Sequence, residues 1–376
     1  MLFFNFIFLL QIIIAISYYN EYKPVIGIYG NPNPEEDYLK GDSDYVPQPY
    51  INWLESLGAE IMIIHQWYSE EKIKNILTKI NGVLFLGGGR EFKKDSNWEK
   101  KALIILNNSI KNNLPLWGTS LGFELMCYLI SEDEKILNDD YNDFIRLHNV
   151  ILNNNTINSK MFELFDERFF NILKNQNSTY YNHQKGVTQN NFYNNSELKD
   201  FFIITSLGVD SNGKEFINSI ESYNKSLNIF GVQFHPEKIP FIRIKNLSIE
   251  TNNDVVRTSI LLGAKFVDIA RKNKNLFQSV DRDKYDFINT YENKTKCSYY
   301  NVEENTFYFT KGNDEKDDNK NDNSLIIGLL IVLALIFCII GVLYFFKHSE
   351  NKNIVNEGLI WKNNIFIKKF IFLIKY

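Results

Sequence analysis

A short turn about one third of the way along the chain has the residues that expose a nucleophile. Residues 117–124 read Trp-Gly-Thr-Ser-Leu-Gly-Phe-Glu, so Gly118 and Gly122 flank Ser120 in the spacing G-x-S-x-G. Small flanking residues let the backbone turn sharply from a strand into a helix and push the serine oxygen out at the carboxyl end of the strand. Because such a turn stores backbone strain, we interpret it as a functional site with Ser120 as the candidate nucleophile.

A histidine and a carboxylate that could serve this nucleophile lie much farther along the chain. Residues 231–237 read Gly-Val-Gln-Phe-His-Pro-Glu, so His235 and Glu237 are separated by one proline. Together with Ser120 they form a nucleophile, a general base and a carboxylate that orients the base, which is the equipment for acyl transfer. An α/β-hydrolase esterase fits less well, because its acid precedes its histidine along the chain.

These two segments resemble the class I glutamine amidotransferase superfamily and, within it, the gamma-glutamyl hydrolases, also called folate polyglutamate hydrolases. The similarity extends over roughly residues 23–277, and four further segments match in family order: 24–28, 50–59, 81–89 and 182–186. One departure is important. The family has cysteine at the nucleophile position, where this chain has Ser120.

The resemblance implies an α/β fold of the flavodoxin-like type, with a mostly parallel sheet flanked by helices. It also implies an omega peptidase that hydrolyses gamma-glutamyl bonds in folylpoly-gamma-glutamates or other gamma-glutamyl peptides, without a metal or other cofactor. In that fold the glycine loop faces the nucleophile, so backbone N–H groups at Gly88, Gly89 and Leu121 would bind the developing oxyanion. His183 and Lys185 match a region near the substrate cleft, and they either contact substrate or belong to a surface loop.

The periodicity of apolar residues predicts alternating strands and helices in the first half of the chain. The predicted strands are 25–29, 60–65, 82–86 and 114–117, and the predicted helices are 49–57, 70–80, 98–112 and 121–130. This alternation indicates a mostly parallel sheet with helices on both faces. Segments 201–205, 217–223 and 229–234 are separated by turns and predict added antiparallel strands. With 376 residues, 44% of them hydrophobic, the chain can bury a large core.

Two apolar segments lie outside this domain. Residues 1–17 are predicted to be a signal peptide, although they lack the usual basic start, so an uncleaved N-terminal anchor stays open. Residues 325–346 carry no charge and are long enough for a transmembrane helix, whereas a buried core helix would show a polar stripe. The predicted parts are therefore a signal peptide (1–17), a gamma-glutamyl hydrolase-like domain (18–300), a polar acidic linker (301–324), a transmembrane helix (325–346) and a cytoplasmic tail (347–376).

Charge distribution predicts where the protein lies and what it does not bind. Several lysines follow residue 346, which by the positive-inside rule predicts a type I membrane protein of the secretory pathway, with its catalytic domain in a vacuole or lysosome or at the cell surface. A net charge of −4 and scattered basic residues argue against nucleic-acid binding. The acidic residues show no metal-ligand spacing with histidines. The oligomeric state, including a homodimer, stays open.

Ser120 leaves two functions open. A cysteine has an ordinary pKa of about 8.5 and is readily held as a thiolate, whereas a serine hydroxyl must lose its proton during the attack itself. Relatives of the peptidase E type nevertheless resemble Ser-His-Glu enzymes on the same scaffold. The alternative is a catalytically inactive, membrane-anchored homologue that binds gamma-glutamyl ligands. A glutamine amidotransferase subunit is disfavoured, because a signal peptide and an anchor would separate it from a cytosolic partner.

Overall fold

The computed structural model describes residues 23–33, 43–94, 96–138, 140–241, 253–288, 299–301 and 306–311. The predicted signal peptide, transmembrane helix and cytoplasmic tail lie outside these ranges, as does most of the predicted linker. Among the described helices, none combines the length and the apolar character that crossing a bilayer requires.

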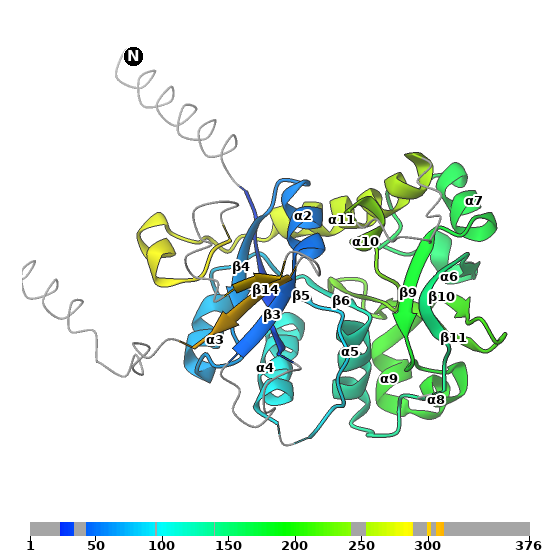
Figure 1. The fold of residues 1–376 in the computed structure, drawn as a ribbon, viewed down its shortest axis with the longest axis horizontal. Coiled ribbons are helices and arrows are strands. Elements are labelled where there is room, and N and C mark those ends of the chain that lie inside the picture. Colours follow the sequence, from blue (N-terminus) through cyan, green and yellow to red (C-terminus); the bar gives the residue numbers. More distant parts are fainter. Residues whose placement is uncertain are drawn as a thin grey trace, which may run out of the picture. The chain divides into compact units, whose positions relative to one another are not determined.

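An eight-stranded sheet forms the centre of the domain, in the order β4-β1-β5-β6-β12-β11-β10-β8 (Figure 1). The first five of these strands are parallel, and they are β4 (Glu60–Ile64), β1 (Val25–Tyr29), β5 (Gly82–Phe85), β6 (Leu116–Thr119) and β12 (Ile229–Val232). The last three are antiparallel additions, and they are β11 (Glu215–Ser222), β10 (Phe202–Val209) and β8 (Ile151–Leu152). The mostly parallel α/β sheet predicted from the sequence is thus confirmed.

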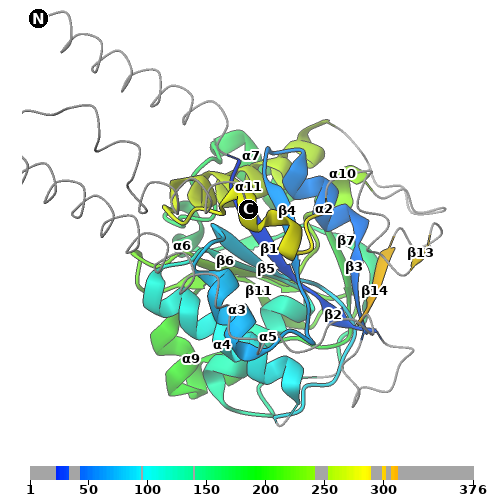
Figure 2. The same cartoon turned by 90° about the vertical axis from the view of Figure 1, so that its left-hand side faces the viewer.

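Helices cover both faces of the parallel part of the sheet, and the apolar residues of its strands point alternately to each face. One buried cluster holds Val25 and Tyr29 of β1, and the other holds Ile26 and Ile28 of the same strand. Figure 2 shows the strands between two groups of helices. The first group is α3 (Glu70–Leu77), α4 (Asn97–Asn112) and α5 (Leu121–Ser131), and the second is α2 (Gln48–Glu55) and α11 (Asn253–Lys272). Because both faces are covered, strands such as β1 are apolar along their whole length.

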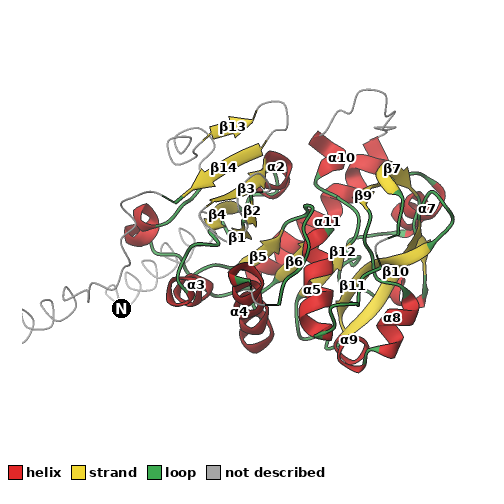
Figure 3. Cartoon of the chain, turned by 60° about the horizontal axis from the view of Figure 1, so that its bottom comes forward, coloured by secondary structure: helices red, strands yellow, loops and turns green. Residues whose placement is uncertain are grey.

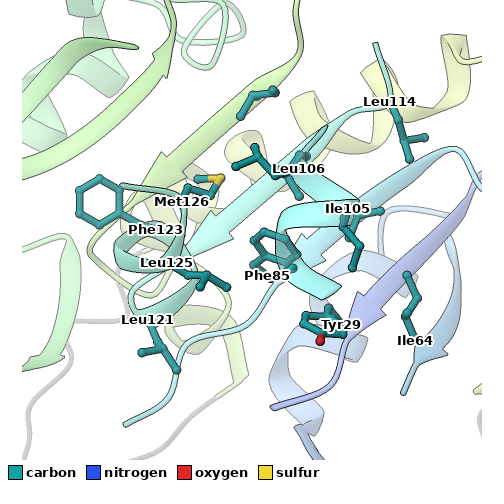
Figure 4. Close-up of a cluster of buried hydrophobic side chains, with 14 of the residues drawn as sticks. Tyr29, Ile64, Phe85, Ile105, Leu106, Leu114, Leu121, Phe123, Leu125 and Met126 are labelled. Atoms are coloured by element: carbon teal, nitrogen blue, oxygen red, sulfur yellow. The ribbon is translucent and has the colours of Figure 1, made fainter. Parts of the chain in front are cut away.

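The first of these clusters fixes the helix that follows the candidate nucleophile. Figure 4 shows Phe123 and Met126 of α5 in the same cluster as Phe85 of β5 and Leu106 of α4. All four side chains are almost fully buried. At roughly 1.5–3 kcal/mol for each large apolar side chain that is buried, this packing anchors α5 firmly on the sheet.

A second, smaller sheet has the order β13-β14-β3-β2, and Figure 3 shows β14 alongside β3. Its strands are β2 (Asn31–Pro32), β3 (Ser43–Pro47), β13 (Tyr299–Asn301) and β14 (Thr306–Thr310). Phe309 of β14 is buried, and its ring centroid lies 5.2 Å from that of His65. The folded domain therefore continues past residue 300, where the sequence placed the start of the linker. The strand was missed because it is short and lies among polar residues.

The rest of the described chain forms short helices and a separate two-stranded ribbon. The ribbon pairs β7 (Asp143–His148) with β9 (Thr179–His183) in antiparallel orientation, and it was not predicted from the sequence. The helices are α6 (Asn154–Ile157), α7 (Glu167–Asn175), α8 (Gln189–Asn194), α9 (Ser196–Phe201), α10 (Lys238–Phe241) and the 3-10 helix Ser279–Lys284.

Candidate active site

Ser120 lies on a strained turn between β6 and α5. Its φ of 50° and ψ of −111° are unusual for a residue with a side chain. The two flanking glycines are needed for close packing, because a Cβ at Gly122 would lie 2.3 Å from the Phe85 carbonyl oxygen and one at Gly118 would lie 2.7 Å from the Gly122 carbonyl oxygen. The Ser120 N–H donates to the Val232 carbonyl at 2.7 Å, which ties the turn to β12. This geometry agrees with the nucleophile turn predicted from the sequence.

His235 and Glu237 follow the strand beside Ser120. Strands β6 and β12 are parallel, and Thr119 pairs with Val232, so both chains leave the sheet at the same edge. The Nδ1 atom of His235 lies 2.8 Å from Oε1 of Glu237, and both side chains are buried. The His235 backbone N–H donates to the Tyr180 carbonyl at 2.8 Å and fixes the segment. The predicted base and its orienting carboxylate therefore follow the strand that pairs with the strand of the predicted nucleophile.

The environment of His235 favours its neutral form. Burial lowers the pKa of His235, and the nearby Lys238 lowers it further, whereas Glu237 opposes this effect. A general base must be unprotonated before the reaction, so this direction suits the role. With Nδ1 directed at Glu237, the other ring nitrogen, Nε2, is the one that can accept a proton.

The glycine loop after β5 touches both the histidine and the start of α5. A Cβ at Gly87 would lie 2.5 Å from Cε1 of His235, and one at Gly88 would lie 3.3 Å from Cδ2 of Leu121 and 2.5 Å from Oη of Tyr45. Gly88 and Leu121, two of the predicted oxyanion donors, are thus close together. Gly89 is exposed, and a Cβ there would meet no atom within 4 Å. Gly87, the glycine that lies against His235, was not among the site residues predicted from the sequence.

Tyr50, in the first turn of α2, connects the glycine loop to the histidine and was also missed as a site residue. Its hydroxyl oxygen accepts a hydrogen bond from the Gly87 N–H at 2.8 Å and lies 3.3 Å from Nδ1 of His235. Burial raises the pKa of the Tyr50 hydroxyl well above its ordinary value, so it stays protonated. The only signal in the sequence was that Tyr50 begins one of the segments that match the family.

His183 and Lys185 lie at the end of β9 and are tied to other parts of the site. The Lys185 ammonium is 2.7 Å from both carboxylate oxygens of Glu91, in the loop that follows the glycines. The buried carboxylate of Glu124, one turn into α5, accepts a hydrogen bond from the Gln233 side chain at 2.9 Å. Burial raises the pKa of Glu124, and the hydrogen bond from Gln233 together with the nearby His183 and Lys185 opposes that rise. The structure thus brings both predicted residues to the same edge of the sheet as Ser120.

Cys127 does not offer an alternative nucleophile. It lies in α5 as a free cysteine and is completely buried. Burial raises the pKa of its thiol well above the ordinary value, which disfavours the reactive thiolate. Within the described ranges, no three His, Cys, Asp or Glu side chains are grouped so that they could hold a metal ion.

Known proteins with similar sequences identify the family of this chain. The family "Glutamine amidotransferase class-I" matches residues 45–246. Gamma-glutamyl hydrolase B of Dictyostelium discoideum is 29% identical over 304 residues, which cover 78% of this chain and 86% of that protein. The gamma-glutamyl hydrolases of Homo sapiens and Bos taurus are 33% and 31% identical, and each alignment covers 68% of this chain and 80% of the relative. The chain therefore belongs to the class I glutamine amidotransferase family and, within it, to the gamma-glutamyl hydrolase family of enzymes.

Proposed function

We propose that this protein hydrolyses gamma-glutamyl bonds in folylpoly-gamma-glutamates, with Ser120 as nucleophile, His235 as general base and Glu237 as the group that orients His235. The observation that carries the proposal is the 2.8 Å contact between His235 and Glu237, on the strand that runs beside the Ser120 turn. The names of the relatives support the gamma-glutamyl bond as the target. The folate part of the substrate rests on the family resemblance.

The reaction begins when the Ser120 hydroxyl oxygen attacks the gamma-amide carbonyl carbon. His235 accepts the hydroxyl proton at Nε2 and gives it to the leaving amine as the C–N bond breaks. The oxyanion of the tetrahedral intermediate is stabilised by the backbone N–H groups of Gly88 and Leu121, each of which contributes roughly 2.7–4 kcal/mol. Water, deprotonated by His235, then attacks the acyl carbonyl carbon, and His235 returns the proton to the Ser120 oxygen as the bond between that oxygen and the acyl carbon breaks.

The test is hydrolysis of a poly-gamma-glutamyl folate by the full-length protein, purified in detergent, beside the variants Ser120→Ala and Ser120→Cys. We expect turnover by the parent and a loss of turnover in Ser120→Ala. Trapping the acyl group on Ser120 by rapid acid quench and mass spectrometry identifies the nucleophile directly. Equal rates for the parent and Ser120→Ala would contradict the proposed mechanism.

A second candidate function is ligand binding without turnover, and the observation that favours it is the serine itself. A hydroxyl in a site that was built for a thiolate lacks the easily lost proton of cysteine. In that case the parent and Ser120→Ala would be equally inactive and would bind the poly-gamma-glutamyl folate with equal affinity in calorimetry. Only Ser120→Cys would then hydrolyse it.

We also propose that the domain is held at a membrane as a type I protein of the secretory pathway. The support is the sequence: an apolar start at 1–17, a segment without charge at 325–346 and a lysine-containing tail at 347–376. Protease protection of intact vesicles tests the topology. We expect a protected catalytic domain, an accessible tail, and release of the domain when residues 325–376 are removed. Fractionation would distinguish vacuole or lysosome from the cell surface, and light scattering would reveal a homodimer.

A further inference from the structure

Asp143 and His183 face each other across the β7–β9 ribbon, where their Cα atoms are register partners. Both side chains are buried, and Oδ2 of Asp143 lies 3.7 Å from Nε2 of His183. The other carboxylate oxygen, Oδ1, accepts hydrogen bonds from Nε2 of His148 at 2.8 Å and from the Ser211 N–H at 3.1 Å. The carboxylate is therefore fixed on one side and directed at His183 on the other.

The hydrogen bonds of His183 determine the charge of its ring. Nδ1 lies 2.6 Å from the Lys185 carbonyl oxygen, which can only accept, so Nδ1 carries a hydrogen. In a neutral ring, Nε2 would then present a lone pair to the Asp143 carboxylate. Neither Nε2 nor Oδ2 has another hydrogen-bond partner among the described residues, so two acceptors would face each other without compensation. A second proton on Nε2 converts this repulsion into an ion pair.

We infer that Asp143 is a positioning residue of the active site, which holds His183 as a doubly protonated imidazolium and through it fixes the Lys185 segment. Burial alone would raise the pKa of the Asp143 carboxyl, but His148 and His183 together lower it to about 2. The carboxylate is thus ionised at neutral pH. Nδ1–H of His183 then donates to the Lys185 carbonyl, and Nε2 lies 3.7 Å from Asp143, so the contribution of His183 to substrate recognition is its charge and its hold on Lys185.

The backbone around Asp143 is strained in a way that maintains this contact. The register of the ribbon breaks between Asp143 and Arg146, and Ile145 has a φ of 51°, which a β-branched residue rarely adopts. As a result, Phe144 and Ile145 leave 47% and 44% of their surface exposed. A regular strand would have neither the positive φ nor the exposed apolar side chains, but it would change which residue opposes His183. Strain of this kind persists where the surrounding structure requires a particular geometry.

The charges around His183 show what its own charge can do. Besides Asp143, the groups that face it are Glu124 of α5, His235 after β12, and the Lys185 ammonium with its partner Glu91. The charge of His183 contributes to the lowered pKa of His235 and opposes the raised pKa of Glu124. Loss of that charge would therefore affect the base as well as the Lys185 segment.

The first test measures the ring of His183 itself and does not require activity. Full-length protein carrying Ser120→Ala is labelled with ¹⁵N-histidine, and the His183 signals are assigned with His183→Gln. At pH 7 we expect two protonated ring nitrogens, and one unprotonated nitrogen, Nε2, after Asp143→Asn. Asp140→Asn is the matched control, because Asp140 is exposed and pairs with Lys214 instead. A neutral His183 ring in the Ser120→Ala protein would overturn the inference, even if Asp143→Asn fails to fold.

The second test uses catalysis and rests on the proposed function. We expect Asp143→Asn to lower kcat/KM for a poly-gamma-glutamyl folate by about 10- to 100-fold, because small displacements near reacting groups are costly. The loss should grow as pH rises, since His183 then loses its second proton, whereas Asp140→Asn should keep the parent profile. A parent profile in Asp143→Asn would overturn the inference. If the parent itself does not turn over, only the proposed function fails, and the ring measurement still decides the role of Asp143.

Discussion

Two buried histidines of this domain have opposite pKa shifts, and they lie in regions with different tasks. His65 lies between Asp44 and Asp286, with Nδ1 3.0 Å from one carboxylate and Nε2 3.1 Å from the other. Burial alone would lower the pKa of His65, but the two carboxylates raise it to about 9. His235 has one carboxylate partner and a lysine nearby, and burial together with that lysine lowers its pKa.

Because both rings are buried, the difference teaches that the number of carboxylate partners decides the charge of each ring. His65 is held as a cation that joins β4, the small sheet and the segment of Asp286, whose backbone carbonyl also accepts a hydrogen bond from the Ile63 N–H. His235 is kept neutral at the edge of the parallel sheet, where a base is needed. One residue type thus serves as a clamp in one region and as a candidate base in the other.

The largest effect is expected from His235→Ala, which should lower kcat by roughly 10⁴-fold or more, because the nucleophile then has no base. The measurement is the steady-state rate, taken in the Ser120→Cys background if the parent is slow. His65→Gln is the matched control and should keep the kcat of the folded protein. A comparable loss of kcat in both variants would show that the two histidines do not divide the tasks in this way.

Removing the carboxylate partner of each histidine should also separate the regions. Glu237→Gln should lower kcat by roughly 10³- to 10⁴-fold, because an amide does not favour the tautomer with hydrogen on Nδ1. Asp286→Asn, the corresponding change at His65, should lower stability and leave kcat unchanged. Rates and urea midpoints measured on the same preparations test both statements. If Glu237→Gln retains the parent rate, Glu237 does not orient His235 for catalysis.

His65→Gln should lower the free energy of unfolding by about 3–5 kcal/mol, because it leaves the fully buried Asp44 carboxylate without its cation. Urea denaturation followed by tryptophan fluorescence measures this loss. Lys74→Gln breaks the exposed ion pair with Glu70 and is the control that should leave the midpoint unchanged. Equal urea midpoints for the parent and His65→Gln would show that His65 does not stabilise the fold through Asp44.

The smallest expected effect is the change of the free energy of unfolding with pH. The folded pKa of His65, about 9, exceeds the ordinary value of 6.5, so its contribution to stability is complete below pH 6.5 and is lost as pH rises through 9. Between pH 7 and 8.5 the free energy of unfolding should fall by about 2 kcal/mol in the parent. In His65→Gln this fall should be absent. Urea titrations at the two pH values measure the slope, and a parallel slope in both proteins would contradict the assignment.

Local sequence patterns predicted much of the fold and the central part of the site. The strands around Val25 and Gly82 follow from continuous apolar runs, and the Ser120 turn follows from glycines whose packing leaves no room for a Cβ. His235 and Glu237 are two residues apart, so their contact is a local property of the chain. Such features depend on neighbours in the sequence, which is why they can be read without the fold.

Contacts between distant segments could not be predicted in this way. Tyr50 reaches His235 across 185 positions, and Phe309 packs on His65 only because β14 pairs with β3. Asp143 opposes His183 because the register of a ribbon breaks at one place. No local residue spacing predicts these contacts, because they form between segments that are far apart in the sequence and are brought together by the fold.

The sequence by itself therefore determined the nucleophile turn, the histidine with its carboxylate, and the alternation that builds a parallel sheet. The tertiary structure decided the charge of each histidine, because that charge depends on how many carboxylates from other segments surround a buried ring. It also decided which glycine touches the candidate base. Residue types set the chemistry that is available, and packing sets the protonation states in which that chemistry begins.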